Sequence, residues 1–233
     1  RGVNQKVHQE KSAFLFKRFK RPVAYVPAPQ DLELLVEVVP YLGVNIDRVR
    51  FKDADAVWKV AGQLLRELQR FHDDGWVFTD LKPDNIVYDE ETGSASFVDA
   101  DSLGKRCQRA KCSERAVFET HLFRSPRRDR LEGKCAHYNP DDGCGLRTPD
   151  SLVSLGFVIW VLLHPTEELD FGYEPGQDSS LLAEHKEDWI EGLSNARLKQ
   201  YFQLAARETP DWAGVRVVVD GESPRHVLVG TST

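Results

Sequence analysis

The sequence predicts an α+β fold in which a small strand-bearing part precedes a larger, mainly helical part. Two short apolar runs near the start of the chain, 23–26 and 32–39, flank a Pro-rich turn and are typical of paired strands. The two clearest helical patterns, 53–71 and 152–163, both come later, so helices dominate the remainder. A chain of 233 residues, 41% of them hydrophobic, is long enough to bury a core in one large domain or two unequal lobes.

Helical and strand patterns alternate in the first half of the chain. Residues 4–19 carry apolar side chains at helical spacing and predict an amphipathic helix. Apolar residues also recur every three or four positions over 53–71, and Gly75 follows as a stop signal. Two short apolar runs, 86–88 and 95–98, are joined by the acidic turn DEETG and predict a β-hairpin.

The second half of the chain is divided between one long polar segment and several helices. Residues 99–149 are polar, basic and Cys-bearing, so we expect an extended functional loop there. The run 152–163 is apolar on all sides and predicts a buried central helix. Amphipathic helices follow over 180–206, and the tail contains one alternating run, 215–219, for which no function is predicted.

Composition excludes two classes of partner. Lys and Arg total 31 against 37 Asp and Glu, so the formal charge is -6 and nothing electrostatic favours nucleic acid. The longest apolar run, 157–163, is too short to cross a bilayer, so no membrane span is expected.

The four cysteines form two local pairs, Cys107 with Cys112 and Cys135 with Cys144. Such pairs in polar segments predict two small disulfide loops and an oxidising, secreted setting. Four free thiols in a cytosolic protein fit the composition equally well. The spacings CxxxxC and CxxxxxxxxC do not match a zinc finger, which makes zinc the weaker alternative.

The residues with the clearest chemistry lie in the string TDLKPDN, 79–85, and at Asp99 just after the predicted hairpin. Phosphoryl transfer needs a carboxylate to orient the attacking hydroxyl, a cation on the migrating phosphate and oxygen ligands for Mg²⁺. Asp80 would be the base and Lys82 the phosphate contact. Asn85 and Asp99 would be the metal ligands, because the hairpin returns Asp99 beside Asn85. The simpler alternative is a Pro turn with solvated charged residues.

This string resembles the catalytic loop HRDLKPxN of the protein-kinase superfamily, and Asp99 resembles the Asp of its DFG motif. Further features follow the kinase order over nearly the whole chain. Glu10 corresponds to the glutamate that a helix of this family supplies for an ion pair. A surface glutamate on an amphipathic helix is an equally good interpretation of Glu10. The backbone groups of Glu37 and Val39 correspond to the hinge that holds adenine.

Two segments after the catalytic string extend the resemblance. The segment from Thr120 to Pro126, THLFRSP, resembles the TxxYxAP stretch that closes an activation segment. Asp150 and the following Ser154-Leu155-Gly156 resemble the DxWSLG opening of the central helix, one residue longer than usual.

The resemblance implies a bilobal protein-kinase-like fold with a reduced N-lobe and a mainly helical C-lobe. The partial N-lobe would span 1–43 and the C-lobe 44–233. Within the C-lobe the catalytic loop would be 78–85, the metal motif 99–101 and the activation segment about 102–127. ATP and Mg²⁺ would be the cofactors, and a protein the substrate or partner.

Several departures from the family pattern bear on activity. No glycine-rich phosphate loop is present, and Lys17 is interpreted as a solvated residue, which leaves no ion-pair Lys. HRD is replaced by Phe78-Thr79-Asp80, so the Arg that would pair with a phosphorylated activation loop is missing. Control by phosphorylation of that loop is therefore not expected. DFG is replaced by Asp99-Ala100-Asp101, and Arg127 stands in place of the Glu of APE.

Two functions remain open from the sequence. One is an atypical Ser/Thr protein kinase, because Lys82-Pro83 disfavours Tyr kinases and small-molecule phosphotransferases. The other is a pseudokinase that acts as a binding scaffold, because phosphoryl transfer depends on positioning groups that are missing here. The Cys pairs and the absent glycine loop resemble secreted rhoptry and with-no-Gly-loop kinases and pseudokinases of apicomplexan parasites. That implies a secreted, vacuolar or extracellular location, with the cytoplasm as the alternative.

Overall fold

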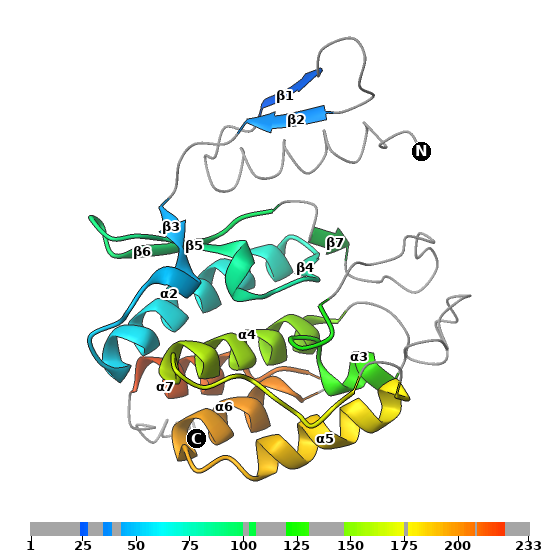
Figure 1. Ribbon diagram of the computed structural model, residues 1–233. Coiled ribbons are helices and arrows are strands. Elements are labelled where there is room, and N and C mark those ends of the chain that lie inside the picture. The colour runs from blue at the N-terminus through cyan, green and yellow to red at the C-terminus, as the bar shows by residue number, and fades with distance from the viewer. Residues whose placement is uncertain are drawn as a thin grey trace, which may run out of the picture.

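The computed structural model describes the backbone of residues 24–27 and 35–38, and residues 43–99, 103–105, 120–130, 147–174, 177–207 and 209–221. Helices make up most of this part, with small antiparallel sheets along one side (Figure 1). The predicted α+β fold with a mainly helical second part is confirmed. No helix in the described part combines the length and the apolar character needed to cross a membrane.

The two predicted N-terminal strands form a hairpin. Strand β1 (Ala24–Pro27) pairs antiparallel with β2 (Leu35–Val38), and Tyr25 lies opposite Glu37. Glu37 is therefore placed on a strand by its backbone. Val39, Glu10 and the helix expected over 4–19 lie outside the described residues.

Helix α2 (Ala54–Asp73) is the longest helix that the structure describes, and it confirms the helix predicted over 53–71, with an end two residues later. The Asp53 side chain caps its start, because Oδ1 accepts a hydrogen bond of 2.8 Å from the Ala56 amide. Its apolar stripe, which includes Leu64 and Leu68, is buried in the core. After the helix, Gly75 takes a φ of 79°, a left-handed conformation that favours glycine.

The predicted hairpin is docked on α2 by polar side chains. Strands β5 (Ile86–Asp89) and β6 (Ser94–Phe97) form a sheet with β3 (Val44–Asn45), which the short helix η1 (Ile46–Arg48) follows. From α2, the Gln63 amide accepts from Ala95 N at 2.7 Å and donates to Gly93 O at 2.9 Å. Glu67 Oε2 accepts from Phe97 N at 3.2 Å. These bonds satisfy edge groups of β6 and so fix the position of the hairpin.

Helix α4 (Thr148–Leu163) lies in the middle of the helical part, between α2 and α6 (Ala196–Ala205) (Figure 1). It is buried along nearly its whole length, as its apolar sequence predicts. Phe157 packs against Phe202, with ring centroids 5.1 Å apart. Helix α5 (Ser179–Glu191) confirms the amphipathic pattern expected over 180–206.

Two interpretations made from the sequence require correction. The segment 99–149 is not only loop: strand β7 (Leu103–Lys105) pairs with β4 (Trp76–Phe78), and α3 (Pro126–Arg130) is a short helix. The alternating run 215–219 is part of helix α7 (Trp212–Asp220). Its buried valines, Val215, Val218 and Val219, lie three and four positions apart, which places them on one helical face.

Candidate active site

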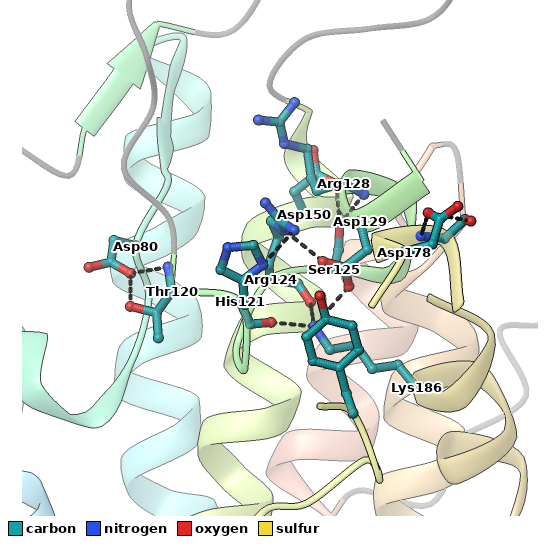
Figure 2. Close-up of polar contacts among 12 residues, drawn as sticks. Asp80, Thr120, His121, Arg124, Ser125, Arg128, Asp129, Asp150, Asp178 and Lys186 are labelled. Carbon is teal, nitrogen blue, oxygen red and sulfur yellow. Dashed lines mark hydrogen bonds and ion pairs between the residues drawn. The ribbon is translucent and has the colours of Figure 1, made fainter. Parts of the chain in front are cut away.

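The Asp80 carboxylate is the centre of a hydrogen-bond network after strand β4. Its Oδ1 accepts from the Thr120 amide at 2.8 Å and from the Thr120 hydroxyl at 2.6 Å (Figure 2). The Oδ2 atom lies 2.9 Å from Lys82 Nζ, and only 14% of the Asp80 side chain is exposed. The carboxylate is therefore held by two segments that are remote from each other in the sequence.

Lys82 bridges the same two residues. Its Nζ also donates to Thr120 Oγ1, at 3.1 Å. The side chain is 23% exposed, so the ammonium group is partly accessible from solvent. A cation in this position combines a fixed orientation with access for an anionic ligand.

The environment of Asp80 keeps the carboxylate ionised. Burial by itself would raise the pKa of Asp80. The hydrogen bonds from Thr120 and Lys82, together with the charge of Lys82, outweigh burial and place the pKa below its usual value of 3.8. At neutral pH the group is thus an anion whose acceptor atoms point in defined directions.

Asn85 and Asp99 lie beside this network. Asn85 ends the short helix η2 (Pro83–Asn85), and its Nδ2 donates to Asp80 O at 2.8 Å. Its backbone carbonyl accepts from Val98 N at 2.9 Å, which brings the next residue, Asp99, alongside. Asp99 is exposed and has a φ of 67°, the only positive φ of a non-glycine residue in the described part. Strained backbone of this kind is concentrated at functional sites.

The donor set at this position fits a hard divalent cation. An amide oxygen and a carboxylate are oxygen ligands of the kind that Mg²⁺ takes, usually with water and phosphate completing its shell. Among the described residues, no group of three or more His, Cys, Asp and Glu side chains could form a metal site of its own. Asn85 and Asp99 would supply two of the oxygen ligands of such a cation.

Comparisons with known proteins identify the fold. No protein-family profile and no curated protein matches the sequence. Among solved structures, vaccinia related kinase 3 matches with a TM-score of 0.64 and 16% identity, over 94% of this chain and 77% of that one. The chain has a protein-kinase fold. A second match, the Cydia pomonella granulovirus kinase PK-1, has a TM-score of 0.63 and 13% identity, over 91% and 78% of the two chains.

Within the kinase fold, four of the seven site residues expected from the sequence are brought together: Asp80, Lys82, Asn85 and Asp99. Of the other three, Glu37 is on β2, whereas Val39 and Glu10 lie outside the described residues. So do all four cysteines, so the expected disulfides stay a prediction, as does the narrower resemblance to apicomplexan kinases.

Thr120 is the site residue that sequence reasoning did not assign. It makes two bonds to Asp80 and one to Lys82, and thereby joins the turn over 120–124 to the loop that follows β4. The signal was present, because Thr120 is the first residue of the segment that resembles TxxYxAP. Its role was not evident, because nothing local shows which group a threonine will contact.

Two neighbouring residues at the opening of α4 contact different segments. Asp150 was matched to the Asp of DxWSLG with one extra residue, but the family spacing counted back from Ser154 leads to Ser151. The Ser151 hydroxyl makes the contact with the strand before the catalytic loop, donating to Phe78 O at 2.9 Å. Ser151 thus contacts strand β4, whereas Asp150 contacts another segment.

Asp150 holds the start of helix α3 and the residue before α4. Its Oδ1 accepts from Ser125 Oγ at 2.6 Å and from Arg127 Nε at 3.1 Å, and its Oδ2 accepts from the Arg147 amide at 3.0 Å. Arg127 also pairs with Oδ2 through its terminal guanidinium nitrogen. Arg127, which stands where the family has Glu, is thus ion-paired with the central helix.

Proposed function

We propose that this chain is a protein Ser/Thr kinase that transfers the γ-phosphoryl group of ATP to a protein hydroxyl. The contact of Asp80 with Thr120 and Lys82 carries the proposal. The substrate hydroxyl oxygen forms a bond to the γ-phosphorus, the bond from that phosphorus to the bridging oxygen breaks, and ADP leaves. Asp80 orients the hydroxyl and accepts its proton.

Lys82 and Thr120 support this step. Lys82 holds its ammonium beside Asp80 Oδ2, where it can neutralise charge on the migrating phosphoryl group. Thr120 restrains the carboxylate by two bonds to one oxygen, so that its second oxygen keeps a fixed direction. Asn85 and Asp99 would hold Mg²⁺, which when bound neutralises the phosphate oxygens.

The location is part of the proposal. The four cysteines favour a secreted or vacuolar protein if Cys107–Cys112 and Cys135–Cys144 are bonded. Mass spectrometry of alkylated, unreduced protein tests this directly. Four alkylated thiols would remove the secreted assignment and favour a cytoplasmic protein.

The activity test compares three proteins in Mg²⁺ with labelled ATP and a generic protein substrate. The wild type and Asp84→Asn should transfer phosphate, and Asp80→Asn should not. Asp84 is a matched control, because its side chain is exposed in the same loop and only its carbonyl is bonded, to Asn45. Equal transfer by the Asp80 and Asp84 variants would contradict the role of Asp80.

A binding measurement separates a kinase from a pseudokinase. A nucleotide at about 100 times its Kd stabilises the protein it binds by about 2.7 kcal/mol, which a thermal shift detects. A shift with ATP and Mg²⁺ but no phosphate transfer would support the pseudokinase alternative. No shift and no transfer would support a scaffold that does not use nucleotide.

A further inference from the structure

We propose that Lys186 on helix α5 is a positioning residue for the phosphotransfer site, acting through the turn that carries Thr120. The inference deepens the proposed function and rests on it. Lys186 contacts neither Asp80 nor Lys82 in any described interaction; it bonds to the residues that follow Thr120 (Figure 2).

Lys186 is fully buried, and all of its donors are directed at one segment. Its Nζ donates to Arg124 O at 2.8 Å, to Asp129 Oδ2 at 2.8 Å, and to His121 O. An ammonium group has three protons to donate, so these acceptors match its capacity. A buried charge is tolerated only with such partners, so the segment and the lysine must adopt this arrangement together.

Arg124 and Asp129 complete the cluster. Arg124 Nε donates to Asp129 Oδ1 at 2.6 Å, and its Nη2 lies 2.9 Å from His121 Nδ1. Asp129 has no exposed side-chain surface, and Arg124 has only 8%. Two cations thus share one carboxylate away from water. The backbone carbonyls of His121 and Arg124 stabilise the second positive charge, so the path of the backbone is part of the ion cluster.

The backbone that Lys186 contacts continues directly into Thr120, which bonds to Asp80. Thr120 O accepts from Phe123 N at 3.0 Å and from Arg124 N at 3.1 Å, which closes a tight turn over 120–124. Lys186 holds this turn from one side through His121 O and Arg124 O. On the other side the Thr120 amide and hydroxyl meet Asp80. A displacement of the turn by about 1 Å would break bonds of 2.6–2.8 Å, and catalysis is sensitive to shifts of this size.

Packing alone does not explain a lysine at this place. The ammonium lies 5.7 Å from the centroid of the Phe157 ring and 5.3 Å from that of Phe171. An apolar side chain between these rings is often as stable as a buried ion pair, or more so. Unlike an apolar side chain, the lysine makes three directed hydrogen bonds to the segment after Thr120.

The test compares Lys186→Met with Tyr201→Phe. Tyr201 is a matched control, because it is also fully buried and loses one polar contact, to Leu152 O at 2.9 Å, within the α4–α6 packing. In Lys186→Met we expect kcat to fall at least tenfold with the KM for ATP unchanged. The Thr120 amide should exchange hydrogen faster relative to core amides of α2 and α4. In Tyr201→Phe both quantities should remain at wild-type values.

A double variant with Thr120→Val tests the route. If Lys186 acts through Thr120, the loss of kcat caused by Lys186→Met is smaller in the Thr120→Val background than in the wild type. Equal losses in both backgrounds would overturn the proposal. If Lys186→Met does not fold, Lys186→Gln, which keeps two of the three N–H donors but no charge, is measured instead. We expect the same faster exchange of the Thr120 amide, and unchanged exchange would overturn the proposal.

The exchange measurement does not require activity. If the wild type transfers no phosphate, the proposed function fails. The coupling of Lys186 to the Thr120 amide can still be confirmed or rejected by exchange alone. A protein that transfers phosphate but shows no such coupling would retain the proposed function and reject the role of Lys186.

Discussion

The hydroxyl and the amide of Thr120 both bond to Oδ1 of Asp80, although 40 residues separate the two in the sequence. Lys82 bonds to both partners and closes the network. The carboxylate of Asp80 and the turn that begins at Thr120 are therefore one structural unit. A change at either residue should be measurable at the other.

Thr120→Val should reduce phosphate transfer, whereas Thr120→Ser should retain most of it. Valine keeps the shape but loses the 2.6 Å bond to an ionised acceptor, and serine restores it. A hydrogen bond to a charged group contributes about 1.5–3 kcal/mol, so kcat should fall about 10- to 100-fold in the valine variant if the bond is needed in the transition state. Steady-state kinetics with ATP and a protein substrate decide this. Equal rates for the two variants would show that the hydroxyl is dispensable.

The free energy of unfolding should depend on pH through Asp80. Because the folded pKa lies below the unfolded value of about 3.9, the carboxylate stabilises the fold above that pH. This contribution is lost as the pH falls through the folded pKa. Urea unfolding of the wild type and Asp80→Asn between about pH 2.5 and 6 should therefore differ most at the upper end.

The control for this titration is Asp84→Asn, which removes the same charge from the loop without touching Thr120 or Lys82. If the wild type and Asp80→Asn differ by the same free energy at every pH, the bonds from Thr120 and Lys82 do not lower the pKa of Asp80.

Gly156→Ala and Gly62→Ala should change stability in opposite directions. A Cβ on Gly156 would lie 2.6 Å from the ring of Phe202, which is fully buried and has no room to move. Overpacking outweighs the better helix propensity of alanine, so we expect a loss of about 1–2 kcal/mol.

At Gly62 the nearest atoms are the ends of the Asp220 and Arg66 side chains, at 3.3 and 3.4 Å, which can shift. We expect a gain of about 0.5–1 kcal/mol there. Urea unfolding measures both, and destabilisation by both substitutions to the same degree would refute the packing argument.

Asp150→Ala should cost more stability than Ser151→Ala. The serine loses one buried bond, to Phe78 O, worth about 1 kcal/mol. Removing the aspartate takes away the acceptor of the buried Ser125 hydroxyl and one partner of Arg127, and we expect a loss of about 3 kcal/mol. Thermal unfolding of both variants checks the order. A larger effect of Ser151→Ala would mean that the contact with Phe78 O, and not the anchor of the activation segment, dominates at the start of α4.

Local patterns were sufficient to predict the order of elements and most of the catalytic loop. Leu64 and Leu68 recur at the spacing of a buried helical face, and α2 forms there. Asp80, Lys82 and Asn85 stand within one short string, so their spacing is itself the signal. The protein-kinase fold could be predicted from the sequence because helical spacing and the order of motifs are local patterns that require no knowledge of distant contacts.

Where one sequence pattern fits two different structures, the sequence alone could not decide between them. The run 215–219 satisfies both strand and helix periodicity, because valines occupy positions that suit either. Packing of Val215, Val218 and Val219 into the core decides for a helix. The start of α4 is similar, since only the tertiary structure shows that Ser151 contacts Phe78 O and that Asp150 contacts Ser125.

The sequence by itself determined which residues are candidates for phosphoryl transfer, and the tertiary structure decided what holds them. A threonine such as Thr120 and a lysine such as Lys186 are ordinary surface residues in any linear reading. The packing of α3 against α5 buries Lys186, and a buried ammonium group needs hydrogen-bond acceptors, which the segment after Thr120 provides. The fold then places that segment on Asp80, and a contact across 40 residues has no local signature because it depends on where distant elements meet.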